Sequence, residues 1–547
     1  MIKLYIYDPL YGKIEFSPLI LRCLMTPEMQ RLREVRLCNI NSLCITGSSN
    51  TNRFEHSVGT AFLASQNIKY NYEKYSGYKE EQELLIVSAL LHDVANGPFG
   101  HSYEYIMEKQ GFIPEEGLES VFVDVTSAGK GAHGYSSPYE PIYFGKLRGL
   151  NSILNSKQKE TVSSIISGKH YFSKLISDKI DLDNIDNVFR MAYHMGIPFP
   201  QEAPIELAKA MYLDGDRIVF KKSAECYLNI WFDTRKKVYK FLLLNPQEFS
   251  GKYMLTEAMD IVFDGISQNN NLSSDIKWYY TDFELLQTLC MHKEIWLNKK
   301  VLLQKDLNKK KIEKILQLNN DEQKEALKSY VESIELLSYV KDKGKSGNSK
   351  QIILSNLFKY TMLPLGQICI EDRNMKFEIS DNKLYKITNI KYNPSQIISR
   401  LMTGDLYDCV MIIKTSDITS YDSFLEYSKR IIIENELECY IRNNKEFQRV
   451  SLGIHPILDV NKTERQLSIC FEDEKELTTI GKSSKELLLG IFLKNEPYGL
   501  KHAKEPLKRY RKNLKSLIID FFEKTFNMNV EEVELYKEVD EYGIKRY

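Results

Sequence analysis

The chain has 547 residues, enough for several domains, and its 43% hydrophobic and 27% charged residues are the proportions of an ordinary globular protein. Lysine plus arginine equals aspartate plus glutamate, with 74 of each kind, so no overall basic field favours binding to nucleic acid. Nine cysteines without a CxxC pair, and no uninterrupted apolar run of about 18 residues, predict a protein of the reducing cytoplasm without a transmembrane helix.

The first half of the chain is expected to be mostly helical. Residues 1–20 resemble a short strand or hairpin that turns at Tyr11-Gly12. Residues 112–150 are rich in Gly, Ser and Pro and poor in periodicity, which predicts an insertion. The segments with helical periodicity are 27–38, 55–75, 81–92, 158–197 (ending at Gly196), 203–212 and 223–245, the last two flanking a short strand at 217–220.

The composition changes beyond residue 270. Residues 299–340 are rich in Lys, Glu and Leu, which predicts solvated helices, and residues 341–350 carry no apolar side chain and form the best linker candidate. Strand-like runs and a final amphipathic helix follow at 385–390, 409–413, 450–454, 466–471 and 507–526. We therefore expect a mainly α protein. Its parts would be a core at 1–270, a helical extension at 271–340 and an α+β regulatory or oligomerisation lobe at 351–547.

Four residues are candidate metal ligands. The stretch LLHDVANGPFG places His92 and Asp93 side by side near the end of one helix, while His56 and Asp183 lie near the starts of two others. Two imidazoles and two carboxylates favour a divalent metal ion such as Mn, Fe, Zn, Ni or Co, with positions left for water or a phosphate oxygen. Each residue alone also has an ordinary explanation, such as a helix cap or a solvated carboxylate. The metal site is therefore predicted from the set.

Five blocks of sequence between residues 7 and 255 carry a resemblance to a known family. They are YDPLYGKIEFSPLILRCLMTPEMQRLREVR, NRFEHSVG, LLHDVANGPFGHSYE, GKHYFSKLISDKIDLDNIDNVFRMAYHMGI and TRKKVYKF. In this order they resemble the HD-domain deoxynucleoside triphosphate triphosphohydrolases, which include the SAM- and HD-domain protein of animals and bacterial dGTPases. The resemblance implies a helical HD core whose metal ligands are His56, His92, Asp93 and Asp183.

The same resemblance implies catalytic and substrate-binding roles for other residues. Arg53 matches an arginine that contacts substrate phosphates, and its forked guanidinium suits a pair of phosphate oxygens. Tyr239 matches a tyrosine beside the sugar or base. His101 and His133 are candidates for the proton donor to the leaving group, although His133 lies in the insertion without the expected glutamate after it. The alternatives are a surface salt bridge for Arg53, core packing for Tyr239 and a loop position for His133.

The chain departs from the family pattern at positions that contact the sugar. Asn187 and Met191 replace a tyrosine and an aspartate, and Leu37 replaces a glutamine. Hydrogen bonds to a substrate hydroxyl strongly affect discrimination between substrates. Hydrolysis of a nucleotide is therefore better supported by the sequence than a deoxynucleotide substrate in particular.

A further departure concerns regulation. Met25 stands where the animal protein has an aspartate that recognises guanine at an activating site between subunits, whereas Gln30 and Arg33 of that region remain. The resemblance thus implies an allosteric site at Gln30 and Arg33 for a nucleotide activator, with guanine disfavoured. It also implies a homo-oligomer, either a dimer or a tetramer.

The function implied is hydrolysis of (d)NTPs to nucleoside and triphosphate, with Mg²⁺ accompanying the nucleotide, in nucleotide-pool control or phage defence. One alternative is another HD nucleotide phosphohydrolase or phosphodiesterase, which the altered sugar contacts favour. A second is a nucleotide sensor or single-stranded nucleic-acid binder without catalysis, for which basic runs at 309–311 and 508–515 are the only sign. Nucleic acid and membrane are not expected as partners.

Overall fold

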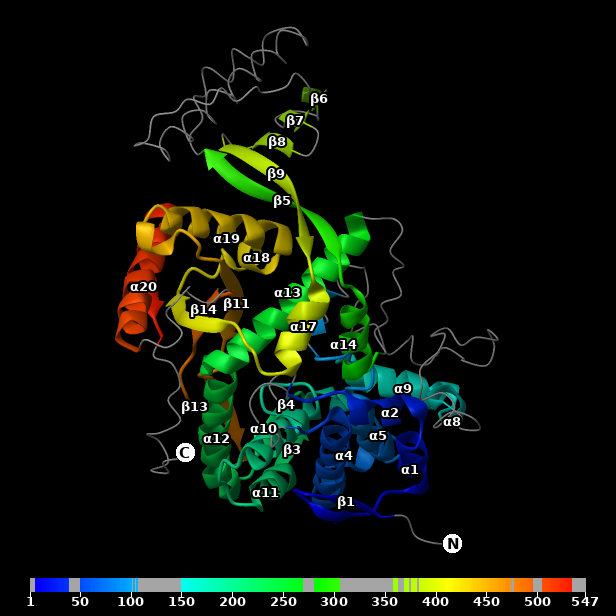
Figure 1. Cartoon of the computed structure of the whole chain (residues 1–547). Helices are drawn as coiled ribbons and strands as arrows, with labels where there is room; N and C mark the ends of the chain where they lie inside the picture. Colours follow the sequence, from blue (N-terminus) through cyan, green and yellow to red (C-terminus); the bar gives the residue numbers. More distant parts are fainter. Residues whose placement is uncertain are drawn as a thin grey trace, which may run out of the picture.

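The computed structural model describes residues 5–38, 50–100, 102–103, 105–106, 149–268, 280–304, 358–362, 368–372, 375–380, 383–472, 474, 477–494 and 504–533. Its N-terminal half is mainly helical and its C-terminal part combines sheets with helices (Figure 1), which confirms the expected fold class. In the described residues no helix has the length and apolar character needed to span a membrane. The predicted linker at 341–350 and nearly all of the predicted insertion lie outside them.

The N-terminal segment begins with the predicted hairpin. Its two strands pair antiparallel, and Gly12 adopts the positive φ of 72° that the tight turn requires. Ser17 then caps a helix that has a proline at its first position. The elements up to residue 91 are β1 (Ile6–Asp8), β2 (Gly12–Ile14), α1 (Pro18–Leu24), α2 (Pro27–Arg31), η1 (Leu32–Glu34), α4 (Arg53–Tyr70), η2 (Tyr72–Tyr78) and α5 (Gln82–Leu91).

The prediction of one helix over 27–38 is wrong at its end. The helix tightens into the 3₁₀ turn η1, and the chain is extended from Val35 onward. The reason is backbone pairing with the segment before α4: Arg53 N donates to Val35 O, and Leu37 N donates to Thr51 O. This pairing brings residue 37 close to the start of α4.

The middle of the chain supplies most of the remaining helices. These elements are α8 (Leu150–Ile153), α9 (Ser156–Ile166), η5 (Tyr171–Leu175), α10 (Leu182–Met195), α11 (Ala203–Ala210), β3 (Met211–Asp214), β4 (Arg217–Phe220), η6 (Lys222–Ala224), α12 (Glu225–Leu244) and α13 (Pro246–Gln268). Helix α10 starts at the cap Asp181, whose side chain accepts from Asn184 N, and it ends at Gly196 with φ of 70° as predicted. The helix expected over 203–212 ends earlier, because Met211 and Tyr212 pair with β4.

The C-terminal part is built of strands and helices. Its elements are α14 (Asp282–Met291), β5 (Ile295–Gln304), β6 (Phe358–Met362), β7 (Ile368–Asp372), β8 (Met375–Ser380), β9 (Lys383–Tyr392), α17 (Pro394–Met402), β10 (Asp408–Thr415), α18 (Tyr421–Leu425), α19 (Tyr427–Arg442), η7 (Lys445–Phe447), β11 (Leu452–Val460), β12 (Leu467–Phe471), β13 (Thr478–Ile480), β14 (Lys485–Leu493), α20 (Lys504–Phe526) and β15 (Glu531–Glu532). The expectation of helices from residue 299 is wrong for 299–304, which pair with β9 as the end of β5. The rest of that range lies outside the described residues.

Three larger sheets organise these strands. Their orders are β11-β14-β10-β15, β5-β9-β8-β7-β6 and β13-β12-β4-β3. The last sheet joins distant parts of the chain, because β12 pairs in parallel with β4, Cys470 opposite Val219. It therefore ties the C-terminal part to the N-terminal helices.

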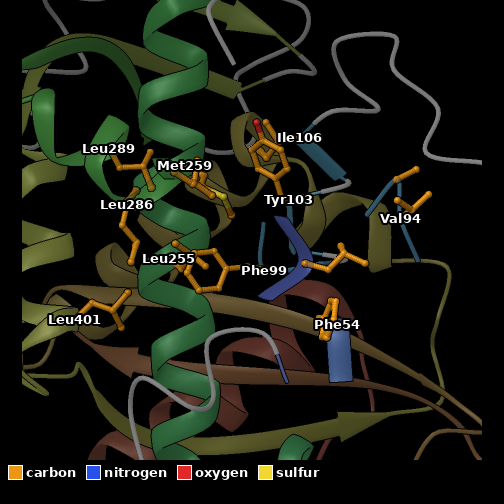
Figure 2. Packing of buried hydrophobic residues seen from close by; sticks show 14 of the residues in the cluster. Phe54, Val94, Phe99, Tyr103, Ile106, Leu255, Met259, Leu286, Leu289 and Leu401 are labelled. Atoms are coloured by element: carbon orange, nitrogen blue, oxygen red, sulfur yellow. The ribbon is translucent and has the colours of Figure 1, made fainter. Parts of the chain in front are cut away.

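Helix α13 crosses the centre of the molecule between the N-terminal helices and the C-terminal sheet (Figure 1). Figure 2 shows Leu255 and Met259 of this helix beside Phe99, Tyr103 and side chains of α14. One buried cluster thus includes residues from both sides of the domain boundary predicted at residue 270. The boundaries themselves remain a prediction.

Candidate metal centre

Three helices converge to form the candidate site. His56 lies in the first turn of α4, which starts where the Asn52 side chain accepts from Glu55 N at 2.9 Å. His92 is the residue immediately after α5, and Asp183 lies in the first turn of α10. Helix ends therefore bring together side chains that are far apart in sequence.

The three side chains present their ligand atoms to one point. His56 Nε2 lies 2.8 Å from Asp183 Oδ1 and 3.3 Å from His92 Nε2, and His92 Nε2 lies 3.6 Å from Asp183 Oδ1. These three ligand atoms all lie within 4.8 Å of one another, a group that could hold a metal ion. The structure thus brings together three of the four predicted ligands.

Asp93, the fourth, lies beside this group. Its carboxylate oxygens are 3.7 Å from His92 Nε2 and 3.9 Å from His56 Nε2. Arg53 Nη1 and Asn96 Nδ2 each donate to this carboxylate at 2.6 Å. Arg53 is therefore placed at the site by Asp93, while metal ligation by Asp93 and phosphate binding by Arg53 remain predictions.

The imidazole tautomers fit a metal ion. His92 Nδ1 lies 2.8 Å from Ala89 O, and His56 Nδ1 lies 2.7 Å from Asp186 Oδ2. Because a carbonyl or a carboxylate can only accept, both Nδ1 atoms carry hydrogen and donate. In the neutral rings, two Nε2 lone pairs then face each other at 3.3 Å. A cation that both lone pairs can bind resolves this contact, as in metal sites whose histidines are oriented by outer hydrogen bonds.

The charges of the site also favour a cation. Burial opposes protonation of His56, but hydrogen bonds to Asp183 and Asp186 outweigh it and raise its pKa to about 10. Burial likewise opposes charge on His92, but Asp93 and Asp183 raise its pKa. The pKa of Asp183 is lowered, because hydrogen bonds from the two histidines outweigh burial. Either a proton on His56 or a metal ion supplies the positive charge that these carboxylates require.

A buried network behind His56 was not predicted from the sequence. Asp186 accepts from His56, from Tyr11 OH at 2.7 Å and from Arg190 through Nε at 2.9 Å and Nη2 at 3.0 Å. Arg190 also pairs with Asp8 at 2.9 Å. Asp186 and Arg190 are fully buried, so the network fixes the orientation of the His56 ring.

Close packing of α4 against α10 brings His56 within hydrogen-bond distance of Asp186. A Cβ at Gly59 would lie 2.1 Å from Asp186 Oδ1 and 2.2 Å from Arg190 Nη2, so a larger residue there would force these side chains to shift. The sequence does carry a signal for the network. Asp183, Asp186 and Arg190 have the spacing i, i+3, i+7 that places charged side chains along one face of a helix.

The predicted sugar-contacting positions also come together. Leu37 and Met191 are buried in a small cluster with Val238, and Tyr239 packs against its edge. Asn187 Oδ1 is buried without a hydrogen-bond partner among the described residues. An apolar wall with one unsatisfied amide oxygen therefore stands where the family pattern has polar side chains. Substrate binding by these four residues remains a prediction.

The predicted allosteric residues line a different cavity. Gln30, Arg33 and Met25 contribute to a cavity of about 410 Å³ whose wall includes Tyr7 and Phe54. Arg33 Nε donates to Gln30 Oε1 at 2.9 Å, and its guanidinium lies 3.7 Å from the centre of the Phe54 ring. Because Phe54 and His56 share the first turn of α4, this cavity and the metal ligands are connected through one element.

Both predicted proton donors, His101 and His133, lie outside the described residues.

Comparisons with known proteins agree with this geometry. The family model for the HD domain matches residues 53–191, which contain all four predicted ligands. The deoxynucleoside triphosphate triphosphohydrolase SAMHD1 of Danio rerio is 27% identical over 283 residues, which cover 46% of this chain and 44% of that protein. The human protein of that name is 26% identical over 277 residues, with 43% and 41% covered.

Bacterial proteins are also similar. The uncharacterised protein YwfO of Bacillus subtilis is 24% identical over 257 residues, covering 46% of this chain and 54% of that protein. A crystal structure of a phosphohydrolase from Bacteroides thetaiotaomicron matches 90% of this chain and 100% of its own chain, with a TM-score of 0.49 and 16% identity. The matches span less than half the length of these two animal relatives. This chain thus contains an HD domain, and its resemblance to the HD-domain deoxynucleoside triphosphate triphosphohydrolases is confirmed.

Proposed function

We propose that this chain is a metal-dependent phosphohydrolase that converts nucleoside triphosphates to nucleoside and triphosphate. The observation that carries the proposal is the convergence of His56, His92 and Asp183 within the segment that matches the HD domain. The relatives whose names state a deoxynucleoside triphosphate triphosphohydrolase activity support the substrate class and the reaction.

His56, His92, Asp93 and Asp183 would hold a divalent ion such as Mn, Fe, Zn, Ni or Co, with Mg²⁺ accompanying the nucleotide. When bound, such an ion lowers the pKa of a water ligand and polarises a phosphate group. Asp186 and the carbonyl of Ala89 keep both Nε2 atoms directed at the ligand point.

The remaining catalytic roles follow from charge and proton transfer. The positive charge of Arg53, held beside Asp93, would offset the negative charge of a substrate phosphate. A histidine would protonate the departing 5′-oxygen, with His101 and His133 as the candidates.

A nucleotide activator and assembly into a dimer or tetramer belong to the same proposal. The cavity of Gln30, Arg33 and Met25 supports the first, because a guanidinium and an aromatic ring are suitable contacts for a nucleotide. A cytoplasmic location and a role in nucleotide-pool control or phage defence remain predictions from the sequence.

A second candidate is another HD nucleotide phosphohydrolase or a phosphodiesterase. It is supported by Leu37 and Met191, two buried apolar residues at positions where the family pattern has side chains that hydrogen-bond to the sugar. A site without those hydrogen bonds would discriminate poorly between deoxyribose and ribose.

Product analysis tests the proposal and separates the two candidates. Purified protein would be incubated with Mn²⁺, Mg²⁺ or Co²⁺ and a panel of dNTPs and NTPs, singly and mixed, and the products separated by ion-pair chromatography. The proposal predicts nucleoside plus tripolyphosphate, lost in the His92→Ala/Asp93→Ala protein and retained in Asp216→Asn, whose side chain is 92% exposed. Mono- or diphosphate products would support the second candidate, and no turnover with any mixture would contradict both.

A further inference from the structure

The segment between β11 and β14 leaves its own sheet to reach the HD domain. β11 and β14 pair antiparallel up to Val460 opposite Lys485, so a short turn would suffice to connect them. Instead, residues 461–484 cross to the N-terminal half, where β12 pairs with β4 and β13 pairs with β12. We call residues 461–484 the bridging segment; residues 473, 475 and 476 lie outside the described part.

The start of the bridging segment is held in a defined position. Asp459 is buried, and its carboxylate accepts from Lys462 N at 2.9 Å and from Thr463 N at 3.1 Å. From the opposite side, Arg235 of α12 donates to Lys462 O at 2.7 Å and to Asn461 O at 3.1 Å. The turn at 461–463 is therefore fixed against the HD half, and it sets the place of the residues that follow.

This position brings Arg465 to a cavity that it shares with one of the predicted metal ligands. Arg465 and Asp183 line the same open cavity of about 450 Å³, together with polar residues between 176 and 184. The side chain of Arg465 is half-buried, and its Nη1 donates to Lys179 O at 2.8 Å. That is the single hydrogen bond of the Arg465 side chain within the described residues, so other N–H donors of the planar guanidinium are available to a ligand.

A second guanidinium lies near Arg465. Arg235 is buried, and its Nε has no hydrogen-bond partner among the described residues. Burial lowers the pKa of Arg235 to about 10, Tyr239 opposes this change, and the charge of Arg465 adds to it. The guanidinium of Arg235 lies 4.3 Å from the centre of the Tyr239 ring, and the pKa of Tyr239, raised mainly by burial, is affected by Arg235, Asp183 and Arg465. Two neighbouring like charges and a buried donor without a partner among the described residues make an environment that an anion would stabilise.

The carboxylates in this cavity do not oppose an anion equally. Asp181 accepts from Asn184 N and from Asp178 N, both at 2.6 Å, so both of its oxygens are engaged by backbone N–H groups at the start of α10. Asp183 faces the two histidines and would be neutralised by a metal ion. The other charged residues that line the cavity are Asp178, whose carboxylate accepts from Lys179 N at 2.6 Å, Lys179 and Arg465. Two cationic side chains therefore remain on the lining, and the charge of Arg235 lies near Arg465.

We propose that the bridging segment supplies Arg465 as a binding residue for a phosphate group of the substrate, so that the C-terminal half completes the site in the HD domain. This inference rests on the proposed function and adds a residue that the HD domain itself does not contain, since residues 53–191 end well before 465. The chemistry recognised is a phosphate oxygen pair, which the forked guanidinium binds in bidentate fashion.

The test is binding of inorganic tripolyphosphate to the metal-loaded full chain, measured by calorimetry with Mg²⁺ in excess of the anion. Loss of a charged hydrogen bond predicts that Arg465→Ala weakens binding about 10- to 100-fold, while its bound metal stays at the wild-type level. Arg465→Lys should recover part of the loss, because it keeps the charge and removes the fork.

A variant of the neighbouring residue Glu464 separates direct contact of Arg465 with the anion from attachment of the bridging segment to α12. Glu464→Gln removes the 2.5 Å ion pair with Lys236, which also holds the bridging segment to α12, without changing Arg465. Unchanged binding in Glu464→Gln with weakened binding in Arg465→Ala supports the proposal. Wild-type affinity in Arg465→Ala, equal loss in both variants, or no binding of tripolyphosphate to the wild type would overturn it.

Failure of this inference can be distinguished from failure of the proposed function. Binding that depends on Arg465 in a protein that hydrolyses no nucleotide would keep the anion site and refute the activity. Hydrolysis to tripolyphosphate with the same KM in wild type and Arg465→Ala would keep the activity and refute the anion site.

Discussion

His56 Nδ1 donates a hydrogen bond of 2.7 Å to Asp186 Oδ2, and both side chains are buried. The bond fixes the imidazole so that Nε2 points to His92 and Asp183. Asp186 is in turn held by Arg190 and Tyr11. The geometry of the candidate ligands therefore depends on residues that would not touch a metal ion.

Replacing Asp186 tests this dependence. Asp186→Asn keeps the shape of the side chain but removes the charge that orients and polarises His56 and that pairs with Arg190. Loss of such an outer partner costs about 10- to 100-fold in metal affinity. Competition titration with a chromophoric chelator measures this affinity. Asp216→Asn, on the surface, should bind metal as the wild type does, and equal affinity in both variants would contradict the role of Asp186.

Gly59 offers a test by packing. In Gly59→Ala the new methyl group would overlap the side chains of Asp186 and Arg190, so this buried network must shift at a cost of about 1–3 kcal/mol. We expect a lower thermal midpoint and weaker metal binding. Gly77→Ala is the matched control, because a Cβ there meets nothing within 4 Å. Wild-type behaviour of Gly59→Ala would show that α4 and α10 are not packed as described.

Metal uptake should release protons. Without a metal ion, hydrogen bonds to Asp183 and Asp186 outweigh burial and raise the pKa of His56 to about 10, so its ring is protonated at neutral pH. A metal ion binds the neutral ring, and the apparent affinity should therefore rise about tenfold per pH unit from pH 7 to 9. Calorimetry in buffers of different ionisation enthalpy counts the released protons. An affinity that does not change with pH would contradict this prediction.

His455 should contribute to loss of stability in acid. It lies half-buried on β11, and burial, followed by the charges of Arg430 and Lys252, lowers its pKa well below 6.5. Below pH 6.5 the unfolded chain takes up a proton that the folded chain excludes, so stability falls as pH decreases, by up to about 1.4 kcal/mol per unit.

The comparison is between thermal midpoints of the wild type and His455→Gln from pH 7 to 5. The midpoint of the variant should fall less steeply, whatever its absolute value, because glutamine does not titrate. Parallel slopes would show that His455 is not held neutral in the folded chain.

Local features of the fold could be predicted because local sequence determines them. Tyr11-Gly12 indicated a hairpin and Gly196 the end of α10, and both are confirmed, since a positive φ is a property of single residues. The helix expected over 27–38 ends early because backbone pairing with the segment before α4 extends the chain from Val35. That pairing joins residues distant in sequence, which periodicity does not detect.

The candidate site shows the same division. His56, His92 and Asp183 were expected to converge, and they do. The role of Asp186 was missed, although its spacing from Asp183 and Arg190 carries a signal. The position of Arg465 in the cavity lined by Asp183 could not be predicted. The alternation of LSICF indicates a strand at 467–471, but it does not indicate that this strand pairs with β4, a pairing that carries Arg465 to the N-terminal half. The partner of a strand depends on packing of the whole chain.

The most direct test of the account is the metal content of the purified chain, measured by elemental analysis after loading with Mn²⁺ and removal of free ion. The account predicts one tightly bound ion per wild-type chain, none in His56→Ala or Asp183→Asn, and one in Asp216→Asn. Folded His56→Ala or Asp183→Asn protein that retains the ion, or a wild type that binds none of the divalent ions named above, would contradict it.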